Sequence, residues 1–156
     1  METSITKTLD DYGIEYTLRE HQNPVFTCED AARERKVRIT QILKCMVGKD
    51  TDSNIHVMLL PGNKILKIRK LRQITGGKRI ELVRPEELSV KFGVTVGAIS
   101  PLQFLGKAEM YLDKTSFLEE TITISSGSPD AGVELKMSDL INLIKPTICD
   151  IISSTE

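Results

Sequence analysis

The sequence predicts a single domain of the α/β (α+β) class, in which a mixed β-sheet of about six to seven strands, partly barrel-like, is flanked by helices. Two observations support this class. Short apolar runs alternate with amphipathic helical patterns along the 156 residues, and no repeat, low-complexity tract or linker interrupts them. Several of the apolar runs have no polar face, which is typical of strands that helices cover on both sides.

Five helices are expected from their start and stop signals. Ser4 and Ser138 are candidate N-caps, and Thr27 followed by Asp30 resembles a capping box. Pro85 suits the first turn of another helix, because its φ angle is already helical. The remaining helix carries Ile68, Leu71 and Ile74 on one face, and Gly13, Gly76 and Gly93 are expected to end the first, third and fourth helices.

Seven strands are expected between these helices, in runs that are apolar or that alternate in polarity. They cover residues 16–19, 42–47, 55–60, 80–83, 109–112, 121–125 and 133–136. Turn-forming residues separate several of them, such as Pro61-Gly62-Asn63 and Gly127-Ser128-Pro129-Asp130.

The bulk composition argues against several classes of protein. A net charge of −1 does not suit a protein held on nucleic acid by overall positive charge, although a local basic patch remains compatible with tRNA. Cys28, Cys45 and Cys149 are widely spaced and form no CxxC pair, so we expect reduced thiols, no metal and no cofactor. The chain has no signal-like segment or bilayer-length apolar run, so we expect a cytoplasmic protein with no membrane partner.

Lys44 is the first candidate for chemistry. It lies in an apolar strand whose two faces both look buried, and its neighbour Cys45 should point to the opposite face. A buried ammonium is costly unless it is paired, so a ligand phosphate, carboxylate or carbonyl would suit it. The alternative is a lysine near a strand end whose amine reaches water.

A glycine-containing loop is the second candidate, with the sequence Gly97-Ala98-Ile99-Ser100-Pro101. Glycine permits backbone conformations that aim several N–H groups at one oxyanion, and Pro101 would stiffen the far end of the loop. The alternative is an ordinary connection, since Gly and Pro are common in loops.

Ser125-Ser126-Gly127 follows an expected strand directly and could place hydroxyl groups at its end. The simpler interpretation is a turn rich in Ser and Gly. His21, in a polar loop, could bind substrate or transfer a proton, or be an ordinary surface histidine, whereas His56 looks structural.

Two further features have a functional and a simpler interpretation. Cys45 could be a nucleophile, because a nearby ammonium lowers the pKa of a thiol, or it could be a buried core cysteine. A basic cluster on and after the third helix could contact phosphates or form a solvated helix face. Its members are Lys67, Arg69, Lys70, Arg72, Lys78 and Arg79.

The order and spacing of these motifs resemble the YbaK/prolyl-tRNA synthetase-associated domain family over nearly the whole chain. The matching stretches are Gly13-Ile14 with Tyr16, residues 21–26, Phe26-Thr27-Cys28-Glu29-Asp30-Ala31-Ala32, Gln41-Ile42-Leu43-Lys44, Leu60-Pro61-Gly62-Asn63-Lys64, residues 97–101, Ser125-Ser126-Gly127 and Val133-Glu134-Leu135. The resemblance implies one editing domain spanning residues 1–156 and deacylation of aminoacyl-tRNA, such as Cys- or Ala-tRNA(Pro).

The resemblance also implies which residues form the site. The family lysine maps onto Lys44, the family glycine loop onto residues 97–101, and the serine of the final hairpin onto Ser125 with Ser126 as a rival. The family often has a hydroxyl residue directly after the lysine, and here that place is Cys45. The expected catalytic residues are Lys44, Gly97, Ala98, Ile99 and Ser100, and the expected substrate-binding residues are His21, Phe26, Cys45, Pro101, Ser125, Ser126 and Gly127.

The expected partner is the 3′ aminoacyl-adenosine end of a mischarged tRNA, with an aminoacyl-tRNA synthetase as an optional second partner. The nucleophile is left open between water, a ribose hydroxyl and a substrate thiol. Two other readings of the site remain. The domain could be a non-catalytic module that binds an aminoacyl-adenosine-like ligand for a synthetase, or a hydrolase that depends on Cys45.

Overall fold

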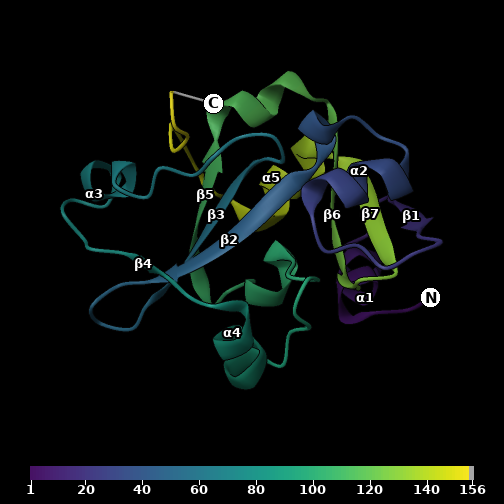
Figure 1. The fold of residues 1–156 in the computed structure, drawn as a ribbon, viewed down its shortest axis with the longest axis horizontal. Helices are drawn as coiled ribbons and strands as arrows, with labels where there is room; N and C mark the ends of the chain where they lie inside the picture. The colour runs from purple at the N-terminus through teal and green to yellow at the C-terminus, as the bar shows by residue number, and fades with distance from the viewer. Residues whose placement is uncertain (155–156) are drawn as a thin grey trace.

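The computed structural model describes residues 1–154 and arranges their strands in two sheets rather than one (Figure 1). A three-stranded antiparallel sheet has the order β1-β7-β6, and a five-stranded mixed sheet has the order β4-β2-β3-β5-β8. The strands are β1 (Thr17–Glu20), β2 (Leu43–Lys49), β3 (Ile55–Pro61), β4 (Glu81–Leu82), β5 (Ala108–Asp113), β6 (Thr121–Ser128), β7 (Ala131–Lys136) and β8 (Thr147–Cys149).

The α+β class is confirmed, but the expectation of one partly barrel-like sheet is wrong in detail. β6 and β7 pair with each other as a hairpin and β1 adds to β7, so this sheet is complete without β2. The two sheets meet through an isolated parallel bridge between Ile42 and Thr123. One bridge is too little pairing to close a barrel, so the sheets remain open layers around a shared core.

The central strand of the larger sheet is β3, which pairs antiparallel with β2 and parallel with β5. Its residues Val57, Met58, Leu59 and Leu60 are completely buried, as the apolar run predicts for a strand covered on both faces. The edge strand β8 was missed by the sequence analysis, because its three residues are too short a run to show a period.

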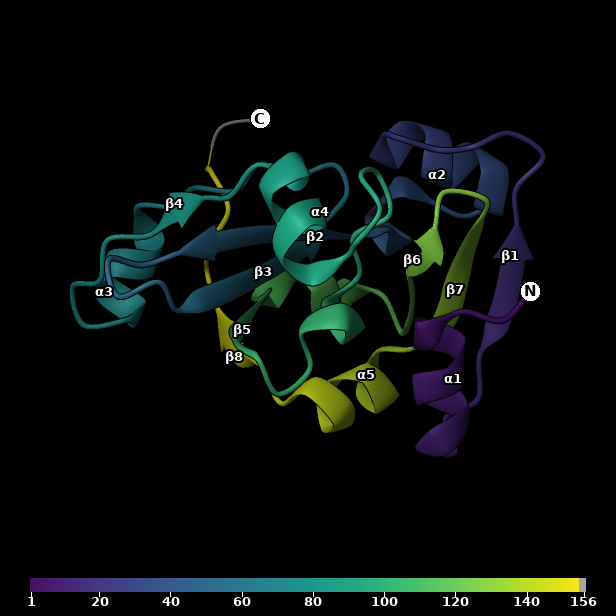
Figure 2. The same ribbon diagram turned by 90° about the horizontal axis from the view of Figure 1, so that it is seen from below.

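The helices are α1 (Ser4–Asp11), α2 (Cys28–Arg35), α3 (Lys70–Ile74), α4 (Pro85–Phe92) and α5 (Met137–Ile144). In both views α1 and α2 lie at the end of the molecule that holds the three-stranded sheet, and α3 lies beside β4 at the other end (Figures 1 and 2). None of the helices described in residues 1–154 is long and apolar enough to cross a membrane.

Two of the predicted helix caps are correct and two are wrong. Thr27 caps α2 by accepting a hydrogen bond from the N–H of Asp30, and Gly93 ends α4 with a φ of +68°. Thr3, not Ser4, caps α1, and the cap of α5 is Lys136, not Ser138. Ser138 lies inside α5, because β7 runs directly into this helix without a connecting loop.

His56 has a structural environment, as expected. It is fully buried, and its two ring nitrogens lie 3.0 Å from the Tyr111 hydroxyl and 2.9 Å from the Asp50 carboxylate. The hydrogen bond with His56 lowers the pKa of Asp50 to about 2. Both ring nitrogens are therefore engaged within the fold.

Candidate functional site

A cavity of about 410 Å³ lies where the two sheets meet, and it gathers residues from four separate segments. They are α2 and the loop before it, the start of β2, the first residue of α4 with the loop that follows this helix, and the middle of β6; α2, β2 and β6 converge at this point in Figure 1. The lining includes Lys44, Cys45, Phe26, Gly97, Ile99 and Ser125, which are six of the twelve residues predicted for the site.

The cavity exists because one edge of β2 is left open. β3 pairs with β2 along residues 43–49, whereas β4 pairs with it at Gly48 and Lys49 alone. Residues 43–46 therefore have β3 on one side and the cavity on the other. This explains why Lys44 and Cys45 both line the cavity, although consecutive strand residues point to opposite faces of the sheet.

Lys44 is half-buried, and its amine is held by a neutral group. Its Nζ donates a hydrogen bond to the carbonyl oxygen of Lys64, in the turn that follows β3. Gly62 packs this turn against the site, since a Cβ atom there would lie 3.0 Å from both the Ile39 carbonyl oxygen and the Ile42 Cβ. Within residues 1–154 Lys44 forms no ion pair, so its charge remains available to a ligand.

The loop of residues 97–101 lies across the same cavity. Gly97 has a φ of +86°, and a Cβ atom at this position would lie 2.8 Å from the ring of Phe26. Glycine is thus required there twice, by the backbone conformation and by the contact. Phe26 itself is 66% exposed, so its ring forms part of the cavity mouth.

The loop offers fewer N–H donors than the sequence suggests. The N–H of Ala98 donates to the Thr95 carbonyl at 2.9 Å, and the N–H of Ser100 donates to the Gln103 side chain at 2.8 Å. Gly97 and Ile99 line the cavity, and their N–H groups have no acceptor among the described residues. The expected set of oxyanion donors therefore narrows to Gly97 and Ile99.

The structure separates the two rival serines. Ser125 lines the cavity, and its hydroxyl accepts a hydrogen bond from the Gly127 N–H at 3.1 Å. Ser126 is fully buried and donates to the Ala131 carbonyl at 2.6 Å, inside its own hairpin. The predicted site residues that do not line the cavity are His21, Ala98, Ser100, Pro101, Ser126 and Gly127.

The thiol of Cys45 is poorly suited to act as a nucleophile. Burial raises its pKa to about 12, so the reactive thiolate is scarce at neutral pH. Burial also raises the pKa of the Cys28 thiol, despite the nearby charges of Lys44 and Arg35. The cavity therefore holds two thiols that behave as small apolar groups.

Replacing Cys45 with serine is expected to leave turnover of aminoacyl-tRNA within about threefold of the unmodified protein, because the thiolate takes no part. The measurement is single-turnover deacylation of a radiolabelled mischarged tRNA. Complete loss of activity in a folded Cys45→Ser protein would revive the cysteine-dependent mechanism.

Arg35, at the end of α2, is a cavity residue that the sequence analysis missed. It is 5% exposed, and it donates from Nε to His21 Nε2 at 3.1 Å and from Nη1 to the Thr123 hydroxyl at 3.0 Å. The stretch Arg33-Glu34-Arg35-Lys36 reads as a solvated charged end of a helix. A signal was nevertheless present, because Arg35 follows Ala31 by four residues and so shares its buried face.

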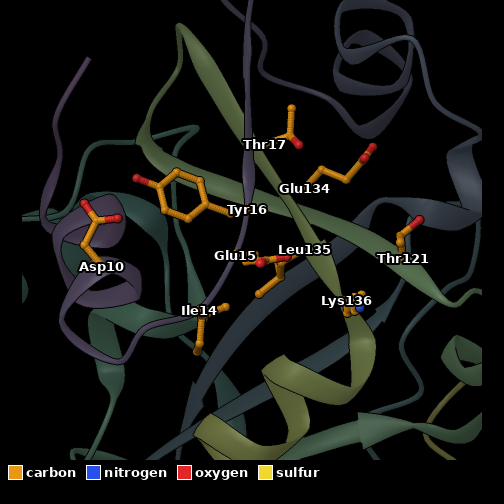
Figure 3. Close-up of a pocket in the computed structure, with 9 residues that line it drawn as sticks. All are labelled: Asp10, Ile14, Glu15, Tyr16, Thr17, Thr121, Glu134, Leu135 and Lys136. Carbon is orange, nitrogen blue, oxygen red and sulfur yellow. The ribbon is translucent and has the colours of Figure 1, made fainter.

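A larger hollow than this cavity lies elsewhere and does not suit a nucleic acid. It has a volume of about 680 Å³ and lies between α1, β1 and β7 (Figure 3). Its lining holds three acids, Asp10, Glu15 and Glu134, against one cation, Lys136, so its net charge is negative and repels phosphate groups. Burial and the Asp10 carboxylate raise the pKa of Tyr16, whose ring points toward α1 in Figure 3.

The described residues contain no group of side chains typical of a metal site. Between residues 1 and 154 no three His, Cys, Asp or Glu side chains are grouped so that they could hold a metal ion.

Comparison with known proteins gives consistent results. The family model described as the aminoacyl-tRNA editing domain matches residues 22–143. A candidate Cys-tRNA(Pro)/Cys-tRNA(Cys) deacylase of Enterococcus faecalis is 23% identical over 125 residues, which cover 80% of this chain and 76% of the relative. The proline–tRNA ligase of Thermosipho melanesiensis is 33% identical over 82 residues, which cover 53% of this chain but only 14% of the ligase.

Solved structures share the fold across its full extent. A candidate trans-editing enzyme for prolyl-tRNA synthetase superposes with a TM-score of 0.82 at 20% identity, covering 99% of both chains. The crystal structure of a hypothetical protein superposes with a TM-score of 0.88, also at 20% identity, covering 97% of this chain and 100% of the other.

Proposed function

This chain belongs to the aminoacyl-tRNA editing domain family, and from that premise we propose that it hydrolyses the ester bond of a mischarged tRNA. The observation that carries the proposal is the placement of the Lys44 amine and the Gly97 and Ile99 N–H groups around one cavity. A cation and backbone donors around an open space suit an ester whose carbonyl oxygen becomes negatively charged during attack.

The reaction proposed is addition of a nucleophile to the ester carbonyl, followed by cleavage of its bond to the ribose oxygen. Lys44 would hold the substrate through the amino-acid carbonyl or the terminal phosphate. The N–H groups of Gly97 and Ile99 would stabilise the tetrahedral oxyanion, at about 3–4 kcal/mol for each donor. Water is the simplest nucleophile and yields the free amino acid and a tRNA with its ribose hydroxyl restored. A substrate thiol would instead release the tRNA and leave the amino acid as a cyclic thioester that water then opens. Attack by a neighbouring ribose hydroxyl would move the acyl group to that oxygen, and water would still have to release it.

The substrates proposed are Cys-tRNA(Pro) and Ala-tRNA(Pro), because the named relatives concern cysteine editing and prolyl-tRNA synthetase. The cavity walls from Ile42, Met46 and Ile99 are apolar and suit a small side chain. Phe26 at the mouth offers an exposed ring on which the terminal adenine could stack. We propose that a protein with this role acts in the cytoplasm, with or without a synthetase as partner.

The proposal is tested by incubating the purified protein with Ala-, Cys-, Ser- and Pro-charged tRNA and measuring the rate of ester loss. We expect one or more of the mischarged tRNA(Pro) species to be deacylated well above the spontaneous rate. Survival of every substrate at saturating protein would contradict the hydrolase, and tight binding without turnover would support a non-catalytic module instead.

The surface that would hold the tRNA body is the basic segment, residues 62–84. It carries eight Lys and Arg residues and one acid, Glu81, a formal charge of +7, while the rest of the chain carries −8. The segment leaves the cavity after the turn at Gly62 and returns to it at Pro85. Its exposed cations are Lys67, Arg69, Arg72, Lys78, Arg79 and Arg84.

Most of these cations are free to contact phosphates. In the part of the chain that the structure describes, Lys67, Arg69, Arg72, Arg79 and Arg84 form no ion pair, whereas Lys70 pairs with Asp150 at 2.9 Å. The overall charge is thus near zero although positive charge is concentrated in the basic segment. This segment begins and ends beside the proposed active site.

Replacing Lys67, Arg69 and Arg72 together with glutamine is expected to raise KM for aminoacyl-tRNA at least tenfold. The salt dependence of binding should become shallower by about one log unit per log unit of salt for each lost phosphate contact. Turnover of the minimal substrate 3′-aminoacyl-adenosine should not change, because it lacks the tRNA body. The matched control replaces the exposed Lys107, Lys136 and Lys145, which lie outside the segment. Equal losses in both triple variants would rule out a dedicated surface.

A further inference from the structure

The guanidinium of Arg35 is a buried cation without an acidic partner in the described structure. Arg35 is 5% exposed, lines the same cavity as Lys44, and takes part in none of the ion pairs found in residues 1–154. Its hydrogen bonds from Nε and Nη1 go to neutral acceptors. Burying a charge in this way costs several kcal/mol unless something compensates it.

The surrounding residues hold this guanidinium in a fixed position. His21 Nδ1 lies 2.8 Å from the Pro129 carbonyl oxygen, so this nitrogen carries the proton and Nε2 is left to accept from Arg35. Burial, together with the charge of Arg35, lowers the pKa of His21 and keeps the ring neutral. Gly132 has no side chain because a Cβ atom there would overlap Arg35 Nε. His21 is therefore a positioning residue and not a proton shuttle.

The charge of the cavity points to the kind of ligand that completes it. Lys44 and Arg35 give its walls two positive charges, and none of the described residues that line it is Asp or Glu. Arg35 lies on α2 and Lys44 on β2, and both elements line this cavity; the charges of both act on the Cys28 thiol, and the exposed Glu29, which acts on it in the opposite sense, does not line the cavity. An oxyanion bound there would replace the missing counter-ion for Arg35 and use its remaining N–H groups.

We propose that Arg35, together with Lys44, binds an oxyanion of the ligand. The identity of that ligand rests on the proposed deacylase activity, whereas the binding of an oxyanion does not. Phosphate and carboxylate share this chemistry. The phosphate on the 5′ side of the terminal adenosine is present in every aminoacyl-tRNA, whereas a carboxylate would have to come from an acidic amino-acid side chain.

The test compares binding of AMP, adenosine and N-acetyl-aspartate to the whole protein by calorimetry and by the shift in Tm. We expect AMP to bind at least tenfold more tightly than adenosine. Arg35→Gln should lose most of this preference while its own Tm stays equal or rises, because a buried uncompensated charge has been removed. Preference for N-acetyl-aspartate over AMP would assign the oxyanion to the amino-acid side chain.

A second variant guards against loss of folding in Arg35→Gln. Thr123→Val keeps the shape of the fully buried Thr123 but removes the acceptor of Arg35 Nη1, so it should weaken the AMP preference by a smaller factor. Equal binding of AMP and adenosine by the unmodified protein would overturn the inference. So would an Arg35→Gln protein with a lower Tm and an intact AMP preference, since Arg35 would then be purely structural. Deacylation is assayed separately, so a protein that prefers AMP but hydrolyses nothing would remove the proposed function alone.

Discussion

Replacing Lys44 with alanine is expected to lower kcat/KM for deacylation by about 100-fold or more while the protein stays folded. The amine lies over the cavity and is held by the neutral carbonyl oxygen of Lys64, so its loss removes positive charge from the reaction site and breaks one hydrogen bond of the fold. The measurement is single-turnover hydrolysis of mischarged tRNA, with circular dichroism and Tm as checks of folding.

The matched control for this experiment is Lys49→Ala, on the same strand. Lys49 pairs with Glu87 at 3.1 Å and lies where β4 covers the strand, outside the cavity. Its replacement should change kcat/KM less than threefold. If Lys44→Ala retains full activity, or if both lysine variants lose activity equally, the amine has no specific part in the reaction.

Replacing Gly97 with alanine is the second change expected to have a large effect, again about 100-fold or more in kcat/KM. Two separate costs act at this position. A side chain at a φ of +86° costs about 1–2 kcal/mol, and the added Cβ atom meets the ring of Phe26 at 2.8 Å. Either the exposed Phe26 ring or the loop must therefore move, and we expect a shift of the loop that displaces the N–H groups of Gly97 and Ile99 from the cavity.

Gly106→Ala separates these two costs. Gly106 has a φ of +76°, but a Cβ atom there meets nothing within 4 Å. Gly106→Ala should lose about 2–8 °C in Tm for a chain of this size, measured by calorimetry, and Gly97→Ala should lose at least as much because the contact with Phe26 adds a second cost. The control should keep its activity, whereas Gly97→Ala should not. A Gly97→Ala protein with normal turnover would show that the loop donors are dispensable.

The elements of the fold could be predicted wherever the signal is local. The apolar run of β3 and the cap at Thr27 depend on residues within a few positions of each other, and both were correct. The division into two sheets could not be predicted, because it depends on which distant strands pair. β1 adds to β7 across more than a hundred residues, and no property of either strand alone specifies this.

The residues of the candidate site, like the elements of the fold, could be predicted only where the signal is local. Lys44 stood out because an ammonium in an apolar strand is unusual by itself, whereas residues 97–101 were singled out mainly by their match to the family's glycine loop. The choice between Ser125 and Ser126, and the engagement of the Ala98 N–H with Thr95, depend on hydrogen bonds that only folded coordinates give. The role of Arg35 could not be predicted, because its side chain packs against Gly132, almost a hundred residues away in the sequence.

The brevity of β4 has a consequence for engineering. An unpaired strand edge is normally a weakness, because it invites other chains to pair with it. Lengthening β4 along β2 would satisfy that edge and make the protein more resistant to heat and aggregation. It would also fill the space between Lys44 and the loop at Gly97. Such a variant should therefore have a higher Tm but no deacylase activity.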